Sequence, residues 1–363
     1  MGDLYPYIAI TFRADAAEAR GDAAGALSIL AEMPLGPDGR FFWRPWRIRH
    51  LTQLAELGSS LPRWATSRWI LAQAMQLLDE SRRGSALKAL EIAVDLRGGD
   101  DELPGVDLAD AHGRVMDRDW VFRQIHLYEL GGLAHFVRRV AAPDLLAGAE
   151  RIHDWVRARM GGFRLVACEP GSVIWEDVLT KAQVSVPNIG SAAMVMPGEC
   201  VIGRLVPIEQ GLMFESAPLL VPEEVALEVA RDPGGWVDVL KAHRRDVDTV
   251  VAPQALLNDV PVALWHYALL SCVPEAKEPA PEHLARGALT LIRSIGAGWA
   301  PQPDELDPWA CLSAALLEPS LGPMVSAMLE PADAELLREL SRRLAEPAAT
   351  VGRLLAEEML RAA

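Results

Sequence analysis

The stretch that decides the fold is FRLVACEPGSVIWEDVLTKAQVSVPN, residues 163–188. Its short runs, rich in β-branched and aromatic residues, are separated by the turn-forming pairs Pro170-Gly171 and Pro187-Asn188. The pattern continues through SAAMVM (191–196), ECVIGRLVPI (199–208) and LMFESAPLLV (212–221), with Pro197-Gly198 between the first two. Six short strands in about sixty residues predict a small antiparallel β-barrel or a strongly bent sheet.

Helical spacing of apolar residues surrounds this β-module on both sides. Ahead of it, residues 5–33 predict a tetratricopeptide-like helical hairpin, in which Gly21 ends the first helix and Asp22 caps the second. Further helices are predicted at 64–80, 85–96, 119–139 and 143–160, and after the module at 222–231, 234–245, 253–272, 281–296, 305–317, 321–329, 331–345 and 347–361. The predicted protein is mainly α with a small β insert, in three domains: an all-α domain (1–160), an antiparallel β-module (161–221) and a helical C-terminal domain (222–363).

The last two predicted helices carry a seam of leucines and similar residues: Leu336, Leu340, Leu344, Val351, Leu354 or Leu355, and Met359. Such a seam either closes a domain core or pairs with another chain. Pro347 interrupts it, and this interruption favours a core over a long coiled coil.

The charge of the chain is unevenly distributed. Its formal net charge is −15; residues 1–160 hold 20 Lys and Arg against 22 Asp and Glu, whereas residues 161–363 hold 15 against 28. Binding to duplex nucleic acid depends on a basic surface that neutralises phosphates, so the second half is unsuited to it. Only the first half offers a local basic face.

That local basic face is the stretch RFFWRPWRIRHLTQLAELGSSLPRWATSR, residues 40–68, which holds six arginines and a single acidic residue, Glu56. The candidate residues for binding an anion or a partner are Trp43, Arg44, Trp46, Arg47, Arg49, Arg63, Trp64 and Arg68. Guanidinium groups pair with phosphates and carboxylates, and indoles stack on bases or on the arginines themselves. Alternatively, the tryptophans anchor the helical core and the arginines pair with the acidic second half.

A metal site and an acid–base site have weaker sequence support. Asp107, Asp110 and His112 are suitable ligand types for a divalent cation, but Asp110 and His112 are two apart and point away from each other on a helix. An acidic loop with a helix cap is the favoured explanation, and no metal site is predicted. The predicted helices also carry His126, His135, His153 and His266, each either a general base or a core residue.

Common catalytic and cofactor signatures are missing from the sequence. It holds no G-x-S-x-G, no G-x-G-x-x-G and no G-x-x-x-x-G-K-[ST]. We therefore expect no nucleotide cofactor, and the sequence assigns no catalytic residue and leaves enzymatic activity open.

The four cysteines, Cys168, Cys200, Cys272 and Cys311, form no C-x-x-C pair and are predicted to be reduced core thiols. The start of the chain, MGDLYPYIAITFR, lacks the pattern of a secretory signal. The long uncharged apolar run, residues 260–274, is too short to span a bilayer. These features predict a cytoplasmic protein without a membrane segment, and the Ala, Arg and Leu bias suggests a bacterial source.

Residues 161–230 carry a resemblance to a known group of proteins. The succession of a Pro-Gly pair at 170–171, DVLT at 177–180 and PGECVIGRLVP at 197–207 resembles the small β-module of uncharacterised actinobacterial proteins that often also carry a SEC-C zinc motif. The cysteine-rich SEC-C segment itself is absent from this sequence. The resemblance implies a bacterial accessory protein with no assigned chemistry, and the zinc-dependent adaptor role of the SEC-C motif is not carried over to this chain.

Together these observations predict a non-catalytic accessory or scaffold protein that binds a protein partner, or itself, through helical surfaces. Two alternatives remain open: an enzyme of an unfamiliar family with its pocket between the helical domain and the β-module, and a binder of single-stranded nucleic acid or a small anion through the Arg/Trp stretch. Neither duplex nucleic acid nor a membrane is an expected partner.

Overall fold

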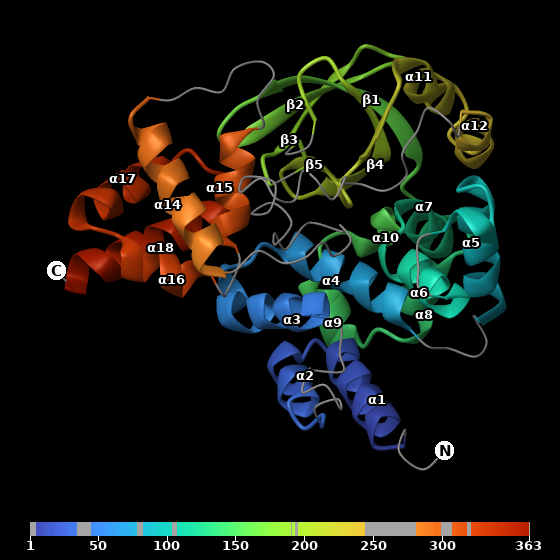
Figure 1. Ribbon diagram of the computed structural model, residues 1–363, viewed down its shortest axis with the longest axis horizontal. Helices are drawn as coiled ribbons and strands as arrows, with labels where there is room; N and C mark the ends of the chain where they lie inside the picture. Colours follow the sequence, from blue (N-terminus) through green and yellow to red (C-terminus); the bar gives the residue numbers. More distant parts are fainter. Residues whose placement is uncertain are drawn as a thin grey trace.

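The computed structural model describes residues 5–34, 45–77, 83–103, 107–189, 191–192, 195–243, 281–298, 307–317 and 321–362. The protein is mainly helical, with an antiparallel, nearly closed β-barrel around residues 160–221 and helices on both sides of it (Figure 1). This architecture confirms the predicted fold class. The three predicted domain limits stay a prediction.

The barrel is built from strands β1 (Met160–Cys168), β2 (Ser172–Asp177), β3 (Gln183–Pro187), β4 (Cys200–Ile208), β5 (Gly211–Phe214) and β6 (Leu219–Val221). Their order is β3-β2-β1-β4-β5, and β6 pairs with the first part of β4. Strands β3 and β5 lie close to each other, which nearly closes the barrel. Inside it, the ring of Trp175 meets Phe214 edge-on at 5.2 Å between centroids, and Phe214 meets Phe163 in the same way at 5.4 Å.

Two of the predicted strand runs differ from the structure. The described residues of SAAMVM (191–196) form a turn and irregular chain, because Ala192 and Val195 fold inward to cover the barrel core and Val195 N donates to Ala192 O. The run LMFESAPLLV is divided into β5 and β6. The chain bends after Phe214, where Glu215 turns its buried side chain toward the helices instead of continuing the strand.

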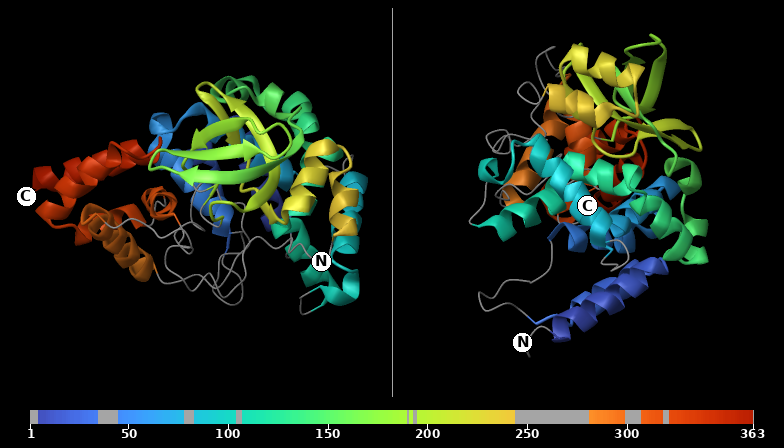
Figure 2. Two further views of the ribbon diagram at one scale, coloured as in Figure 1. Left: turned by 90° about the horizontal axis from the view of Figure 1, so that it is seen from above. Right: turned by 90° about the vertical axis from the view of Figure 1, so that its right-hand side faces the viewer.

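The first half of the chain forms helices α1 (Tyr5–Ala19), α2 (Ala23–Leu30), α3 (Pro45–Leu57), α4 (Arg63–Gln76), α5 (Arg83–Leu96), α6 (Leu108–Arg118), α7 (Trp120–Gln124), the π-helix η4 (Ile125–Glu129), α8 (Gly132–Arg139), α9 (Pro143–Gly148) and α10 (Ile152–Trp155). The predicted hairpin is confirmed: Gly21 adopts a φ of +81°, and the Asp22 side chain accepts from Gly25 N at 2.8 Å. This hairpin lies at the lower edge of the molecule in Figure 1 and in the right-hand view of Figure 2.

Two predicted helices are interrupted by tertiary contacts. The predicted helix 119–139 is divided into α7, η4 and α8, with Gly131 in the left-handed region. The predicted helix 143–160 ends at Gly148, because the backbone N of Glu150 donates to the hydroxyl of Ser67 and Arg151 adopts a φ of +48°. Local spacing of apolar residues carries no information about either interruption.

The C-terminal part contains α11 (Glu223–Arg231), α12 (Trp236–Ala242), α14 (Pro281–Gly296), α15 (Pro308–Leu316), α16 (Leu321–Met328), α17 (Pro331–Ser341) and α18 (Ala348–Ala362). The predicted helix 253–272 lies outside the described residues. Leu340, Leu344 and Val351 of the predicted seam are buried in the core of α14–α18, which confirms the core interpretation, and Leu354 is exposed.

The barrel contacts both helical parts: in Figure 1 it lies above the N-terminal helices and beside α15. Val206 and Met213 belong to the same core as the N-terminal helices. On the other side, Asn188 Nδ2 donates to the Asp307 carboxylate at 2.5 Å, which ties the end of β3 to the start of α15. The two helical parts also contact each other directly, because the Gln53 amide of α3 donates to the carbonyl of Leu317 and Leu57 packs against the core of α14–α18.

Candidate functional site: the arginine stretch and the outer face of α1

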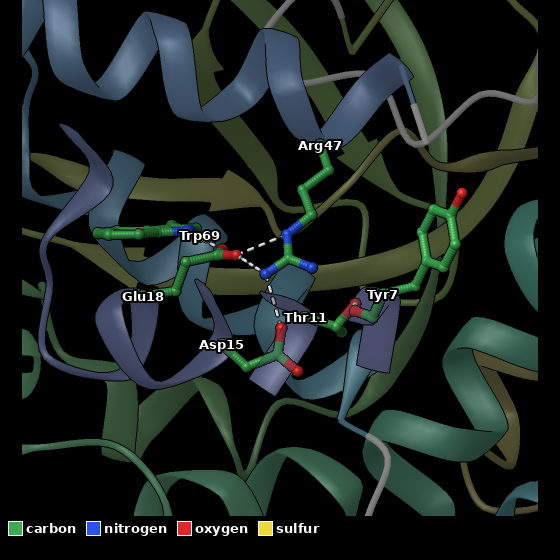
Figure 3. Close-up of polar contacts among 6 residues, drawn as sticks. All are labelled: Tyr7, Thr11, Asp15, Glu18, Arg47 and Trp69. Carbon is green, nitrogen blue, oxygen red and sulfur yellow. Dashed lines mark hydrogen bonds and ion pairs between the residues drawn. The ribbon is translucent and has the colours of Figure 1, made fainter. Parts of the chain in front are cut away.

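Arg47 points from the first turn of α3 toward α1 and is only 1% exposed (Figure 3). Its Nε donates to Glu18 Oε1 at 2.6 Å, and its Nη2 donates to Asp15 Oδ1 at 2.6 Å and also to Glu18. The second oxygen of Glu18 accepts from Trp69 Nε1 at 2.9 Å. These residues, Arg47, Glu18, Asp15 and Trp69, form what we term the α1 clamp, which fixes α1 to α3 and α4.

The α1 clamp holds two carboxylates and one guanidinium. Burial raises the pKa of Glu18, against the opposing effects of Arg47 and the Trp69 indole. Burial likewise raises the pKa of Asp15, and Arg47 opposes it there too. The clamp is thus an internally paired group whose arginine does not face solvent.

Arg63, Trp64 and Arg68 contact the segments that enter and leave the barrel. Arg63 donates to the carbonyls of Ala147 at 3.0 Å and Ala149 at 2.7 Å, and its exposed head pairs with Glu209 at 3.1 Å. The buried Arg68 donates to the carbonyl of Phe214 at 2.5 Å and lies over the buried ring of Trp64, 5.4 Å from its centroid. Trp64 and Arg68 are thus buried, whereas Arg63 is bound to its neighbours at the surface.

The other residues of the predicted binding face are described less fully. Trp43 and Arg44 lie outside the described residues, and for Trp46 and Arg49 only the backbone of α3 is described. A single face formed by all eight candidates therefore stays a prediction.

A buried polar network lies between η4 and the barrel. The amide of Gln124 donates to Glu215 at 2.5 Å and accepts from Arg204 Nε at 2.8 Å. Arg204 also pairs with Glu129 at 2.5 Å, and the Trp236 indole donates to the same Glu129 oxygen at 2.9 Å. A π-helix often marks a functional site; here Gln124, the last residue of α7, and Glu129, the last residue of η4, contact the Arg204 side chain of the barrel.

His50 on α3 belongs to the same junction. Burial, together with the nearby charges of Arg68 and Arg123, lowers its pKa to about 4, so it is neutral at pH 7. Its Nε2 is inaccessible and has no hydrogen-bond partner among the described residues. Burial by itself would raise the pKa of Glu215, yet Arg123, Ser216, Gln124 and Arg68 outweigh burial and lower it.

The predicted metal ligands have ordinary structural contacts. Asp107 caps α6 by accepting from Asp110 N at 2.8 Å, and His112 contacts Asp100 at 2.7 Å. Across the described residues, no group of three or more His, Cys, Asp or Glu side chains is suited to hold a metal ion.

The predicted histidines are dispersed along the chain. His126 stacks on Phe122, with 5.7 Å between ring centroids, whereas His135 and His153 belong to α8 and α10. His266 and Cys272 lie outside the described residues.

Sequence reasoning missed the outer face of α1, which we define as Ile8, Ala9, Phe12 and Ala16. Ile8 is 51% exposed and Phe12 56% exposed, although both are large and apolar. The same helix buries Glu18 and directs Asp15 to Arg47 (Figure 3). The i, i+4, i+8 spacing of Ile8, Phe12 and Ala16 was the available signal, but spacing alone does not say which face points outward.

Compared with protein-family models, curated proteins and solved structures, the chain matches none of them. None of the helices in the described residues has the length and apolar character needed to cross a membrane.

Proposed function

We propose that this chain is a non-catalytic accessory protein that binds a protein partner, or itself, through helical surfaces, and that the outer face of α1 is the principal one. The observation that carries the proposal is the pair of large apolar side chains that α1 exposes. The helix already buries Ile10, Ala14 and Ala17 in the core, yet Ile8 and Phe12 remain half-exposed. We place the protein in the bacterial cytoplasm, with which the reduced thiols of Cys168 and Cys200 are consistent.

The free energy of apolar burial favours a partner that covers the exposed face of α1. Full burial of an Ile or Phe side chain stabilises by roughly 1.5–3 kcal/mol, so two half-exposed side chains leave a gain of that order unrealised in the isolated chain. The α1 clamp holds the helix rigidly from behind, which lowers the entropy that a partner would have to remove on binding. Within the clamp, the Arg47 guanidinium and the Trp69 indole donate to the carboxylates of Glu18 and Asp15.

The test compares the double variant Ile8→Asp/Phe12→Asp with the wild type, and with Leu354→Asp as a control on the half-exposed leucine of α18. Size-exclusion chromatography with light scattering reports self-association, and affinity purification from the host reports a bound partner. We expect the α1 variant to lose whichever association the wild type has, at an unchanged melting temperature, while Leu354→Asp retains it. A wild type that is strictly monomeric and retains no partner overturns the proposal.

A second candidate function is favoured by one observation, the inaccessible Nε2 of His50 without a described partner, near the guanidinium groups of Arg68 and Arg123. An imidazole nitrogen without a described partner, close to the positive charges of two arginines, suits a small anion such as phosphate or a carboxylate. An anion held there at ten times its Kd would stabilise the fold by about 1.4 kcal/mol. Phosphate and citrate should then raise the melting temperature more than chloride at equal ionic strength, and His50→Gln should abolish the difference. An equal rise with chloride excludes this candidate.

A further inference from the structure

The rim of the α1 outer face is basic. Arg13 and Arg20 are exposed and lie on α1 and directly after it, whereas Glu18 is buried and Asp15 is bound to Arg47. Arg13 pairs with the exposed Glu32 of the segment after α2 at 2.7 Å. Arg20 makes no ion pair with any described residue.

Two more arginines lie near the same end of α1. The backbone N of Ala142 donates to Ala19 O at 2.9 Å, which brings the segment just after α8 against the last residue of α1. Arg138 and Arg139, in the last turn of α8, are exposed, and within the described part of the chain neither forms an ion pair. Together with Arg20 they form what we term the basic corner.

The acidic side chains close to the basic corner interact with the first turns of helices. Asp22 caps α2 by accepting from Gly25 N at 2.8 Å. Asp144 lies in the first turn of α9, where its charge interacts favourably with the helix dipole. The basic corner therefore sets three arginines against two acidic residues that are engaged at helix starts, on a chain whose net charge is −15.

We propose that the outer face of α1 docks an acidic amphipathic helix of a partner protein. Apolar residues of that helix cover Ile8 and Phe12, and its carboxylates pair with the basic corner of Arg20, Arg138 and Arg139. This inference rests on the proposed function and specifies the chemistry of the partner. A helix suits the surface because the exposed apolar residues recur every four positions, as in helix-to-helix docking.

A second copy docked through its own α1 fits this surface less well. Antiparallel packing of two α1 helices would bring together faces whose exposed ionic residues are arginines, and like charges across an interface weaken binding and discourage the wrong partner. An acidic partner converts the same arginines into favourable contacts and is steered toward them by long-range attraction.

The experiment uses the full-length protein and two synthetic, end-capped helical peptides with the same leucine stripe. One peptide flanks the stripe with glutamates and the other with lysines; binding is measured by fluorescence anisotropy at low salt. We expect the glutamate peptide to bind at least about tenfold more tightly, and its advantage to shrink as salt screens the exposed charges.

Two variants separate the inference from the proposed function. The charge reversal Arg20→Glu/Arg138→Glu/Arg139→Glu should remove or invert the preference between the peptides, whereas Phe12→Asp should weaken binding of both. Leu354→Asp is the matched control and should change neither.

Equal binding of both peptides that is still lost in Phe12→Asp would overturn the acidic-partner inference and leave docking on α1 intact. A homodimer that Phe12→Asp abolishes would likewise overturn the acidic-partner inference and leave docking on α1 intact. Binding of neither peptide overturns the inference, and the association measurements on Ile8→Asp/Phe12→Asp then decide separately about the proposed function.

Discussion

Arg47→Met tests the α1 clamp directly. The side chains of Arg47 and Glu18 are each 2% exposed, and the guanidinium donates to both Glu18 and Asp15. Methionine retains much of the apolar stem of arginine but removes the charge and every donor. Glu18 then keeps only the indole of Trp69 as a side-chain donor among the described residues.

The expected loss of unfolding free energy follows from the two carboxylates that Arg47→Met leaves without a guanidinium partner. Removing one partner of a buried ion pair costs about 3–5 kcal/mol, because the other charge stays buried without compensation. Asp15 moderates this loss, since its side chain is 28% exposed and regains water. Glu18 moderates it further by taking up a proton, because burial already raises its pKa. We expect a loss of about 3 kcal/mol at pH 7 and a smaller loss near pH 5.

Urea unfolding followed by tryptophan fluorescence measures the effect in the wild type, Arg47→Met, Glu18→Gln and the double variant. The double-mutant cycle should give a coupling of about 1–3 kcal/mol between the two positions. A loss below about 1 kcal/mol, the value of an exposed ion pair, or the absence of coupling would refute the clamp. If partner binding fell instead, Arg47 would belong to a binding face after all.

Three further predictions concern pH and packing. Because burial raises the pKa of Glu18, the free energy of unfolding should fall as pH rises from the unfolded-state pKa, about 4.3, through the folded-state value, and Glu18→Gln should flatten this slope. His50 affects the free energy of unfolding in the opposite direction. Because its pKa is lowered to about 4, stability should fall on acidification from about pH 6.5 to about pH 4. His50→Gln should remove that contribution in acid titrations of unfolding. In Gly162→Ala the new Cβ would lie 2.0 Å from the backbone oxygen of Ala226 on α11, so we expect a loss of about 1–3 kcal/mol. Gly113→Ala, in open space on α6, should instead be neutral or stabilising by up to about 1 kcal/mol in the same urea assay.

Local patterns made much of the fold predictable. Alternating β-branched runs between proline-containing turns located the barrel, and Gly21 with Asp22 located the turn of the first hairpin. Both signals act within a few residues of the chain, where spacing and turn chemistry dominate. The same signals failed at SAAMVM, whose apolar residues cover the barrel end instead of joining a strand.

The candidate site was harder to predict because its contacts join distant residues. Arg47 and Glu18 are 29 positions apart, and Arg204 and Glu129 are 75 apart. An arginine in a sequence looks the same whether it faces solvent or a buried carboxylate. Only the approach of α1 to α3 decides that Arg47 is buried, and only that approach turns Ile8 and Phe12 outward.

The contacts of Arg204 cross the predicted domain limit at residue 160. The guanidinium projects from β4, yet its partners, Gln124, Glu129 and the carbonyl of Ala158, all precede that limit. A fragment that begins at residue 161 would carry the arginine without these partners and would lose the apolar cover that the helices provide. The barrel and the N-terminal helices therefore share one buried network, and a truncation at residue 160 would break it.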